Sequence, residues 1–426
     1  MLLGTATVDI TPPVGVMLAG STRRRPSVGM EDPLLCKAMV LESCGVRLAL
    51  VTLDLIGLDL EVCNRAKARI QDAVGIPYEH VLINCSHTHS GPYTTLALDP
   101  DETPDPTYLQ RIQDAIADSV QQAGDSLLEV RVGCASSTLP GIGGNRRLLR
   151  PNGDAINNWL ASEQERRSLP PAGPTDDSLA AWVFFSGDAP VATLWSYTLH
   201  VNNHFGDGFS ADYPGHVAAA LEDLFGTGFF TLFLPGACGD INRRGLSLEE
   251  LYSVMSKAVG ELVGCVRPAE DEALAAVLSP IELPVRDCEP FQEEEIRTKW
   301  PDAFDVFENE HRLLSQMGRR GLTTTLQALR IGGGAIACTP GETFVKLGLG
   351  IKALSPYTPT VVAELCNDII GYIPTREAYW QGGYETFRAR TAQVAPGAGE
   401  QIACTLIRML PRLGRPHTSA QRPRAR

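Results

Sequence analysis

Apolar and polar positions follow one another along this chain in a pattern that predicts successive strands and helices. Two apolar runs, at 36–41 and 47–54, are typical of a strand pair. Helical periodicity follows over 60–74, with Lys67 on the outer face, and residues 81–83 form a short, mostly apolar run. A strand, a helix and a strand in this order predict a parallel pair of strands, with functional residues at their carboxyl ends.

The same two periods continue along the chain and predict one α/β domain over residues 1–410, with mixed β-sheets flanked by helices. Further helices are expected at 108–127, 215–225, 247–265 and 343–354. Further strands are expected at 130–137, 180–185, 191–197, 229–234, 322–331, 335–339 and 361–365. Residues 151–177 predict a long surface excursion. Residues 411–426 contain five arginines and no acid, and we expect a basic, disordered tail.

Composition narrows the class of protein. The chain has 426 residues, of which 44% are hydrophobic and 20% charged, which is typical of a globular protein. A net charge of -13 argues against nucleic-acid binding, because phosphate contacts need a basic face. No run reaches the length of a transmembrane helix, and the first residues lack the basic start of a signal peptide. Eleven cysteines without a Cys-x-x-Cys pair favour free thiols and a cytoplasmic location.

Histidines stand at the ends of two predicted strands. His87 and His89 follow the 81–83 run, and His200 follows the 191–197 run. If the first strand stays extended, alternation turns His87 and His89 to opposite sides, so that only one of them faces a given metal. A turn cap at 90–92 is the competing interpretation of that pair.

An acid and a phenol stand at comparable places. Glu342 follows a strand-end Pro-Gly, although a charge in the first turn of the next helix explains it equally well. Tyr372 follows a further predicted strand. Two neutral imidazoles with one carboxylate are a common set for catalytic zinc, which brings the pKa of its bound water toward about 7 and supplies hydroxide.

Two glycine-rich loops and one arginine run are weaker candidates. The 141–147 loop, which contains Arg146, is a possible ligand-facing segment, although a simple turn is the commoner explanation. The 235–242 loop contains Asp240 and Asn242 and can present backbone amides to an anion, but it lacks the lysine of a nucleotide-binding P-loop. The arginines at 23–25 predict a solvated face without a role in a site.

Five motifs, in this order, resemble the catalytic domain of the neutral/alkaline ceramidase family. The resemblance runs from about Thr5 to Glu385, and its elements are Asp9-Ile10-Thr11-Pro12-Pro13, His87-Thr88-His89-Ser90-Gly91-Pro92, Gly239-Asp240-Ile241-Asn242, Pro340-Gly341-Glu342 and the segment from Gly371-Tyr372 to Tyr384-Glu385. The resemblance implies a zinc ion held by His87, His200, Glu342 and Tyr372. It also implies that His89, Arg146 and Tyr384 surround the scissile amide.

The chain departs from that family at one motif in particular. The family has a serine in Gly-Asp-x-Ser-Pro-Asn, whereas this chain has Asn242 followed by Arg243 and Arg244, so a serine-dependent step is not available there. The family's C-terminal β-sandwich domain and secretion signal are also expected to be missing. The resemblance therefore supports zinc-dependent hydrolysis more strongly than it supports ceramide as the substrate.

The sequence thus predicts a zinc-dependent hydrolase, with Zn²⁺ as cofactor. It is expected to cleave an amide bond, N-acyl and ceramide-like, by zinc-bound hydroxide, with Asp240 and Asn242 contacting a small-molecule substrate. An esterase or lactonase, a lactam-processing enzyme and a non-catalytic lipid-binding relative are the alternatives.

Overall fold

The computed structural model describes residues 1–22, 24–95, 102–286, 290–318 and 321–415. A five-stranded sheet has the order β5-β4-β3-β1-β6. Its strands are β1 (Leu2–Asp9), β3 (Leu35–Ser43), β4 (Val46–Leu53), β5 (Val81–Cys85) and β6 (Leu128–Glu129). Strands β3 and β4 pair antiparallel, and β4 runs parallel to β5 through helix α1 (Leu60–Val74), so the predicted strand pair and βαβ unit are confirmed.

Two four-stranded sheets form the other half of the β-structure, with orders β14-β12-β11-β7 and β16-β17-β18-β20. The strands of the first are β7 (Arg131–Thr138), β11 (Ser178–Ser186), β12 (Ala189–Tyr197) and β14 (Phe230–Pro235). Those of the second are β16 (Leu274–Pro284), β17 (Gly321–Ile331), β18 (Gly334–Cys338) and β20 (Thr360–Ala363). A bridge between Gly236 and Ala363 joins the two sheets. Each contains one parallel pair, β12 with β14 and β18 with β20.

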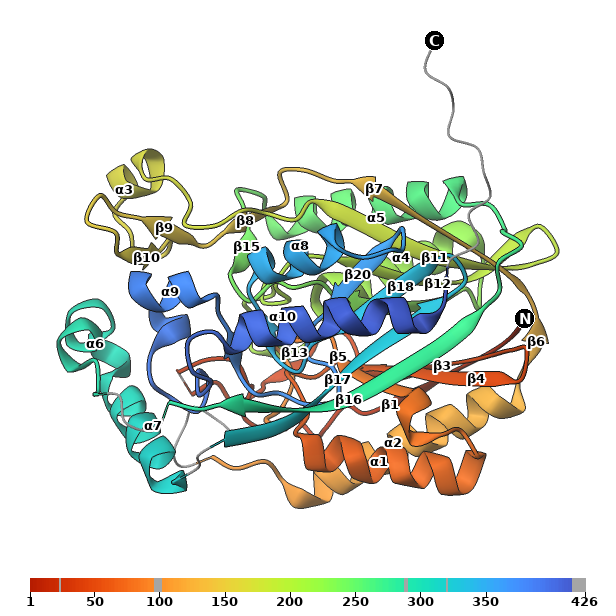
Figure 1. The fold of residues 1–426 in the computed structure, drawn as a ribbon, viewed down its shortest axis with the longest axis horizontal. Helices are drawn as coiled ribbons and strands as arrows, with labels where there is room; N and C mark the ends of the chain where they lie inside the picture. Colours follow the sequence, from red (N-terminus) through yellow and green to blue (C-terminus); the bar gives the residue numbers. More distant parts are fainter. Residues whose placement is uncertain (23, 96–101, 287–289, 319–320, 416–426) are drawn as a thin grey trace, which may run out of the picture.

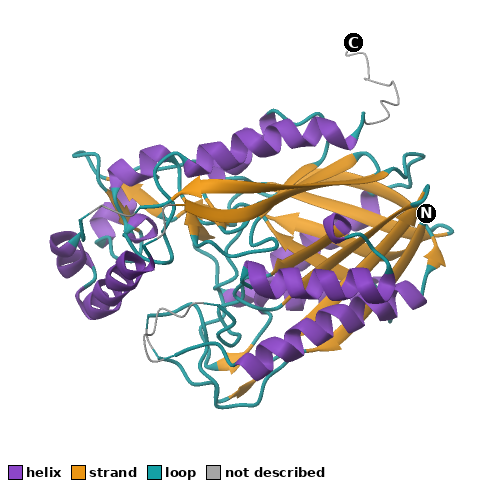
Figure 2. Cartoon of the chain, turned by 60° about the horizontal axis from the view of Figure 1, so that its bottom comes forward, coloured by secondary structure: helices purple, strands orange, loops and turns teal. Residues whose placement is uncertain are grey.

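The strands occupy the middle of the molecule and the long helices cover its outside (Figures 1 and 2). Apolar residues of all three sheets share one central core, in which Leu50, Trp182 and Ile336 are fully buried. Helices α1 and α2 (Pro106–Asp125) bury a second core against the five-stranded sheet. Helices α4 (Asp212–Phe225) and α5 (Leu248–Cys265) cover the β14-β12-β11-β7 sheet, and α8 (Val345–Ala353) and α10 (Ala398–Met409) cover the β16-β17-β18-β20 sheet. The predicted α/β fold with mixed sheets and flanking helices is therefore confirmed.

Short elements connect these layers at one end. The two-stranded pairs are β2 (Gly29–Met30) with β13 (Gly208–Phe209), β8 (Gly143–Asn145) with β15 (Ile241–Arg243), β9 (Arg147–Leu149) with β10 (Ala155–Asn157), and β19 (Glu342–Thr343) with β21 (Tyr372–Ile373). The remaining α-helices are α3 (Glu163–Ser168), α6 (Glu293–Lys299), α7 (Phe304–Met317) and α9 (Arg376–Gln381). The predicted surface excursion at 151–177 thus contains β10 and α3.

Two expectations differ from the structure. Lys67 points inward and is fully buried, because its position on α1 faces the packed side of the helix beside Tyr78. The domain also continues beyond residue 410, since Leu413 is buried and the Gly414 carbonyl accepts a hydrogen bond from the Tyr357 hydroxyl. Residues 416–426 of the predicted tail lie outside the described residues. Across the described chain, no helix is both long and apolar enough to cross a membrane.

Candidate active site

The His87 box begins where the chain leaves the five-stranded sheet. Strand β5 ends at Cys85, and the N–H groups of Ser86 and His87 donate to carbonyl oxygens at and just beyond the end of β4 (2.8 and 3.0 Å). His87 has φ 69°, a left-handed conformation that ends the extended geometry. The expected alternation therefore does not apply. The imidazoles of His87 and His89 converge, with their Nε2 atoms 3.4 Å apart.

Glu342 and Tyr372 come together through a pair of two-residue strands. They lie directly opposite each other in the parallel pairing of β19 with β21, so their side chains project to the same face. Gly239 lies against this pair, because a Cβ there would come within 2.4 Å of the Glu342 carbonyl oxygen. His200 follows β12, and its N–H donates to the Ile241 carbonyl (3.4 Å). Loops after three separate sheets thus meet at one point.

Four side-chain atoms converge at that point. Nε2 of His89 lies 3.1 Å from Nε2 of His200, and the three ring nitrogens of His87, His89 and His200 suit a metal ion. Oε2 of Glu342 lies 3.4 Å from Nε2 of His87 and 3.9 Å from Nε2 of His200. Nitrogen ligands around a tetrahedral zinc are about 3.4 Å apart, given Zn–N bonds of about 2.0–2.1 Å. The spacing therefore fits a single ion.

Backbone carbonyls hold the three rings in one tautomer. Nδ1 of His87 lies 2.7 Å from the Ile56 carbonyl oxygen, and Nδ1 of His89 lies 2.9 Å from that of Gly20. Nδ1 of His200 lies 3.4 Å from the Cys238 carbonyl oxygen. An Nδ1–H donated to each carbonyl leaves a lone pair on every Nε2. Three lone pairs directed at one point repel each other, and a cation between them removes that repulsion.

The electrostatic environment of the cluster favours a single positive charge among the three histidines and Glu342. Burial lowers the pKa of His89 and of His200 well below the usual value, and the neighbouring His87 and Arg146 lower both further. Burial also opposes charge on His87, but the adjacent Glu342 carboxylate outweighs it and raises the pKa of His87. Oε2 of Glu342 is buried and has no hydrogen-bond partner among the described residues. A divalent cation would give that oxygen a partner, so the residues fit a metal ion.

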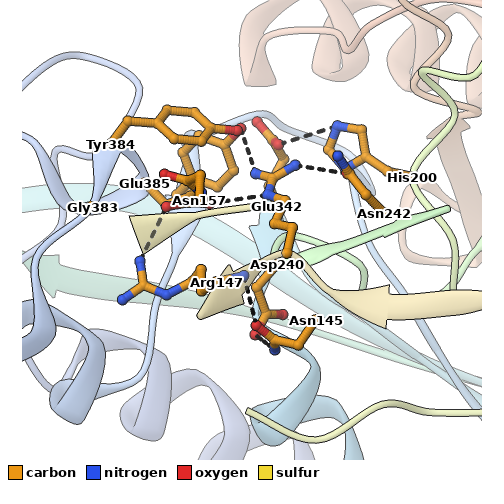
Figure 3. Close-up of polar contacts among 12 residues, drawn as sticks. Asn145, Arg147, Asn157, His200, Asp240, Asn242, Glu342, Gly383, Tyr384 and Glu385 are labelled. Carbon is orange, nitrogen blue, oxygen red and sulfur yellow. Dashed lines mark hydrogen bonds and ion pairs between the residues drawn. The ribbon is translucent and has the colours of Figure 1, made fainter. Parts of the chain in front are cut away.

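Arg146 lies beside this cluster, between two tyrosines. Its guanidinium is 1% exposed, and it donates from Nη2 to the Tyr372 hydroxyl (3.2 Å) and from Nε to Oε1 of Glu385 (2.9 Å). The Tyr372 and Tyr384 hydroxyls are 2.9 Å apart, and Figure 3 shows Tyr384 together with Glu385, the residue that follows it. Burial raises the pKa of the Tyr384 phenol, so the hydroxyl keeps its proton. Arg146 and the Tyr384 hydroxyl can therefore both donate hydrogen bonds to a bound oxygen.

Glu385 is a site residue for which the sequence offered no role. Its side chain is fully buried, and its two oxygens accept from Arg146 and from Nη1 of Arg147 (3.1 Å), while Asn157 donates to Oε1 (2.8 Å). Burial opposes ionisation of Glu385, but the two arginines outweigh it and lower its pKa. Its place directly after Tyr384 was the only available signal.

The two residues expected to contact substrate are placed differently. Asn242 lines the cavity above the histidines, and its Oδ1 accepts from Nη1 of Arg146 (3.2 Å). Asp240 is buried away from the cavity, because its carboxylate accepts from the Val345 N–H at the start of α8 (2.8 Å) and from the Asn145 amide (2.6 Å). These bonds give Asp240 a structural place, and Figure 3 shows it beside Asn145.

A cavity of about 890 Å³ opens above the cluster. It is lined by all four predicted ligands, by His89, Arg146 and Tyr384, and by residues that the sequence did not single out. Among the latter, Trp159 and Trp300 pack on the Tyr384 ring with centroid distances of 5.8 and 5.3 Å. Arg25 also lines the cavity and is paired with Asp207 (3.1 Å), so the expected solvated face was wrong for Arg25, whereas Arg24 is exposed as expected. Arg23 lies outside the described residues.

Solved structures share this fold. Neutral ceramidase from Pseudomonas aeruginosa superposes with a TM-score of 0.74 and 18% identity, over 99% of this chain and 76% of that one. A ceramidase complexed with C2 gives a TM-score of 0.73 and 17% identity, over 99% and 77% of the two chains. No protein-family model and no curated protein matches the sequence. The chain therefore has a neutral ceramidase-like fold, which confirms the resemblance at the level of the fold.

Proposed function

We propose that this protein is a zinc-dependent hydrolase that cleaves an N-acyl amide bond. The observation that carries the proposal is the convergence of the ring nitrogens of His87, His89 and His200 beside Oε2 of Glu342, at the floor of a cavity that also contains Arg146 and Tyr384. The neutral ceramidase-like fold supports an amide as the bond that is cleaved.

The ligands we propose are His87, His200, Glu342 and Tyr372. A zinc ion there would polarise the acyl carbonyl and lower the pKa of a coordinated water molecule. His89 is left for proton transfer, since it is the least buried of the three histidines and lines the open cavity. With Nδ1–H donated to the Gly20 carbonyl, its Nε2 is free to accept a proton and pass it to the leaving nitrogen.

Arg146 and Tyr384 would stabilise the negative charge that develops on the acyl oxygen. Hydrogen bonds to Glu385 and Asn242 already hold Arg146 before substrate arrives. The Tyr372 hydroxyl likewise holds Tyr384, so little reorganisation is needed during the reaction. The aromatic wall of Trp159, Trp300 and Tyr384 offers an apolar surface for an acyl chain.

The decisive experiment combines metal analysis with a substrate panel. Protein purified without added metal is analysed for zinc and then assayed with N-acyl amides of graded chain length and with matched esters. We expect about one zinc per chain and amide hydrolysis that a chelator abolishes and zinc restores. Zinc-loaded, folded protein that cleaves esters but no amide would replace the amidase by an esterase, and protein that cleaves neither would refute the proposal.

A further inference from the structure

One side of the cavity contains polar groups that the proposed chemistry does not use. Arg243, at the end of β15, and His204, after β12, both line it. Nη1 of Arg243 and Nε2 of His204 are each buried, and neither has a hydrogen-bond partner among the described residues. Nε2 of His204 nevertheless faces Oε1 of Glu31 at 3.9 Å, so Arg243 is the group without an acidic partner. Buried donors without partners are uncommon, because desolvation is not offset. The Arg243 donor on this cavity points to a ligand that carries acceptor oxygens.

The other described arginines of the cavity already have acidic partners. Arg146 pairs with Glu385 (2.9 Å), Arg25 with Asp207 (3.1 Å) and Arg24 with Glu102 (2.6 Å). Within the described residues, Arg243 has no ion pair. Its positive charge is therefore available to an anion that enters the cavity.

The backbone around these two groups is held firmly. The buried Asp212 carboxylate accepts from the N–H groups of Asn203 (2.5 Å) and His204 (3.0 Å), and it thereby fixes the loop that carries His204. Arg243 pairs with Gly143 in the β15–β8 ladder. A preformed site of this kind binds a charged group without the entropic cost of ordering a loop.

The two polar groups and the aromatic wall come from different segments of the chain that line one cavity. Trp159 and Trp300 lie on the Tyr384 side. Arg243 directly follows Asn242, and the loop of His204 adjoins His200, whose carbonyl accepts from the Asn203 amide (2.8 Å). If an acyl chain packs on the aromatic wall, the amine half of the substrate is left for the remaining part of the cavity, which Arg243 lines.

We propose, on the basis of the proposed function, that Arg243 binds a carboxylate in the amine half of the substrate, so that the substrates are N-acyl amino acids. A planar guanidinium matches the two oxygens of a carboxylate, and one arginine without an acidic partner suits a single negative charge.

Equilibrium binding tests this assignment without relying on turnover. The two probes are the ketomethylene analogue of N-dodecanoylglycine and that of the corresponding uncharged methoxyethyl amide. In both, a methylene group replaces the amide nitrogen, so neither is hydrolysed. Calorimetry with the zinc-loaded protein should give a Kd about tenfold to a hundredfold lower for the carboxylate probe, the range expected for a charge-assisted hydrogen bond.

Three variants locate the preference. Arg243→Gln should abolish it and leave the Kd of the uncharged probe within about twofold, a change well under 1 kcal/mol. Arg243→Lys, which keeps the charge but loses the planar fork, should retain part of it. Arg244→Gln is the matched control, since Arg244 is the exposed neighbouring residue and does not line the cavity, and it should behave as wild type.

Equal affinity of wild type for the two probes, or a preference that survives in folded Arg243→Gln, would overturn the assignment. Hydrolysis of the two parent amides is measured separately. A preference that depends on Arg243, found in protein that cleaves neither amide, would refute the proposed function and leave the carboxylate site standing.

Discussion

The Oε2 atom of Glu342, in β19, lies 3.4 Å from Nε2 of His87, which follows β5 in a different sheet. Both side chains are almost fully buried, at 7% and 2% exposure. An ionised carboxylate in such a place is costly unless a positive charge accompanies it. The fold therefore supplies a strong reason for a cation between these two residues.

His87→Ala and His200→Ala should each release the zinc, because each removes one of a small set of protein ligands. Zinc per chain, measured after dialysis of folded protein, checks this prediction. His216→Ala is the control, since His216 is exposed on α4 and stacks on Tyr252, and it should keep its zinc. Full zinc occupancy in both of the first two variants would remove them from the ligand set.

His89→Ala should retain zinc and lose about a hundredfold or more in turnover, as expected for removal of a general acid or base. Zinc content, melting temperature and turnover are to be measured on one preparation. Because Nε2 of His89 lies 3.4 and 3.1 Å from those of His87 and His200, a ligand role is the specific alternative. Loss of zinc would establish that alternative, and unchanged turnover with zinc retained would exclude His89 from the reaction.

Glu385→Gln should lower the free energy of unfolding by about 3–5 kcal/mol, because it leaves Arg146 and Arg147 buried without their shared counter-charge. Chemical denaturation measures the change. The control Glu377→Gln breaks an exposed pair with Lys346 and should cost less than about 1 kcal/mol. Similar losses of unfolding free energy in the two variants would show that burial does not strengthen the ion pairs of Glu385.

Lys67→Met should stabilise the protein at pH 7. Burial lowers the pKa of Lys67 from 10.5 to about 8, and its Nζ has no hydrogen-bond partner among the described residues. The folded protein therefore binds the proton of the Lys67 ammonium group more weakly than the unfolded chain does. The charged side chain destabilises the folded state below pH 8, and this destabilisation disappears as the pH rises toward 10.5.

The expected gain for Lys67→Met is about 3 kcal/mol at pH 7 and falls to about 1 kcal/mol near pH 10. Denaturation curves at the two pH values measure both quantities. Lys257→Met, at an exposed position on α5, is the matched control and should change stability by less than about 0.5 kcal/mol. A Lys67→Met protein that is no more stable than wild type at pH 7 would contradict the prediction.

All eleven cysteines should react with a thiol reagent in denatured, unreduced protein. The ten cysteines in the described residues are free, and among them Cys44, Cys265 and Cys404 are exposed and should react first in the native protein. Burial raises the pKa of the Cys36 thiol to about 12, so this residue should react only after unfolding. A count well below eleven would indicate disulfides.

Local sequence signals were sufficient for the regular elements. The predicted bounds of α1, 60–74, agree with the structure because the apolar period and the left-handed Gly75 after it are both local features. The strands β11 and β12 were likewise recognisable from continuous apolar runs. The direction of a buried side chain was less accessible, as Lys67 shows, because it depends on what packs against the helix.

The candidate site, too, was predictable from the sequence in part and was otherwise decided by the tertiary structure. Residue types, strand ends and motif order indicated His87, His200, Glu342 and Tyr372 from the sequence. Their convergence required the tertiary structure, because the pairing of β19 with β21 and the bridge between Gly236 and Ala363 join segments far apart in the chain. The left-handed turn at His87, which brings His89 to the same point, is imposed by backbone bonds to the end of β4. Periodicity reports which face of an element is apolar, whereas the packing of three sheets decides which loop ends meet.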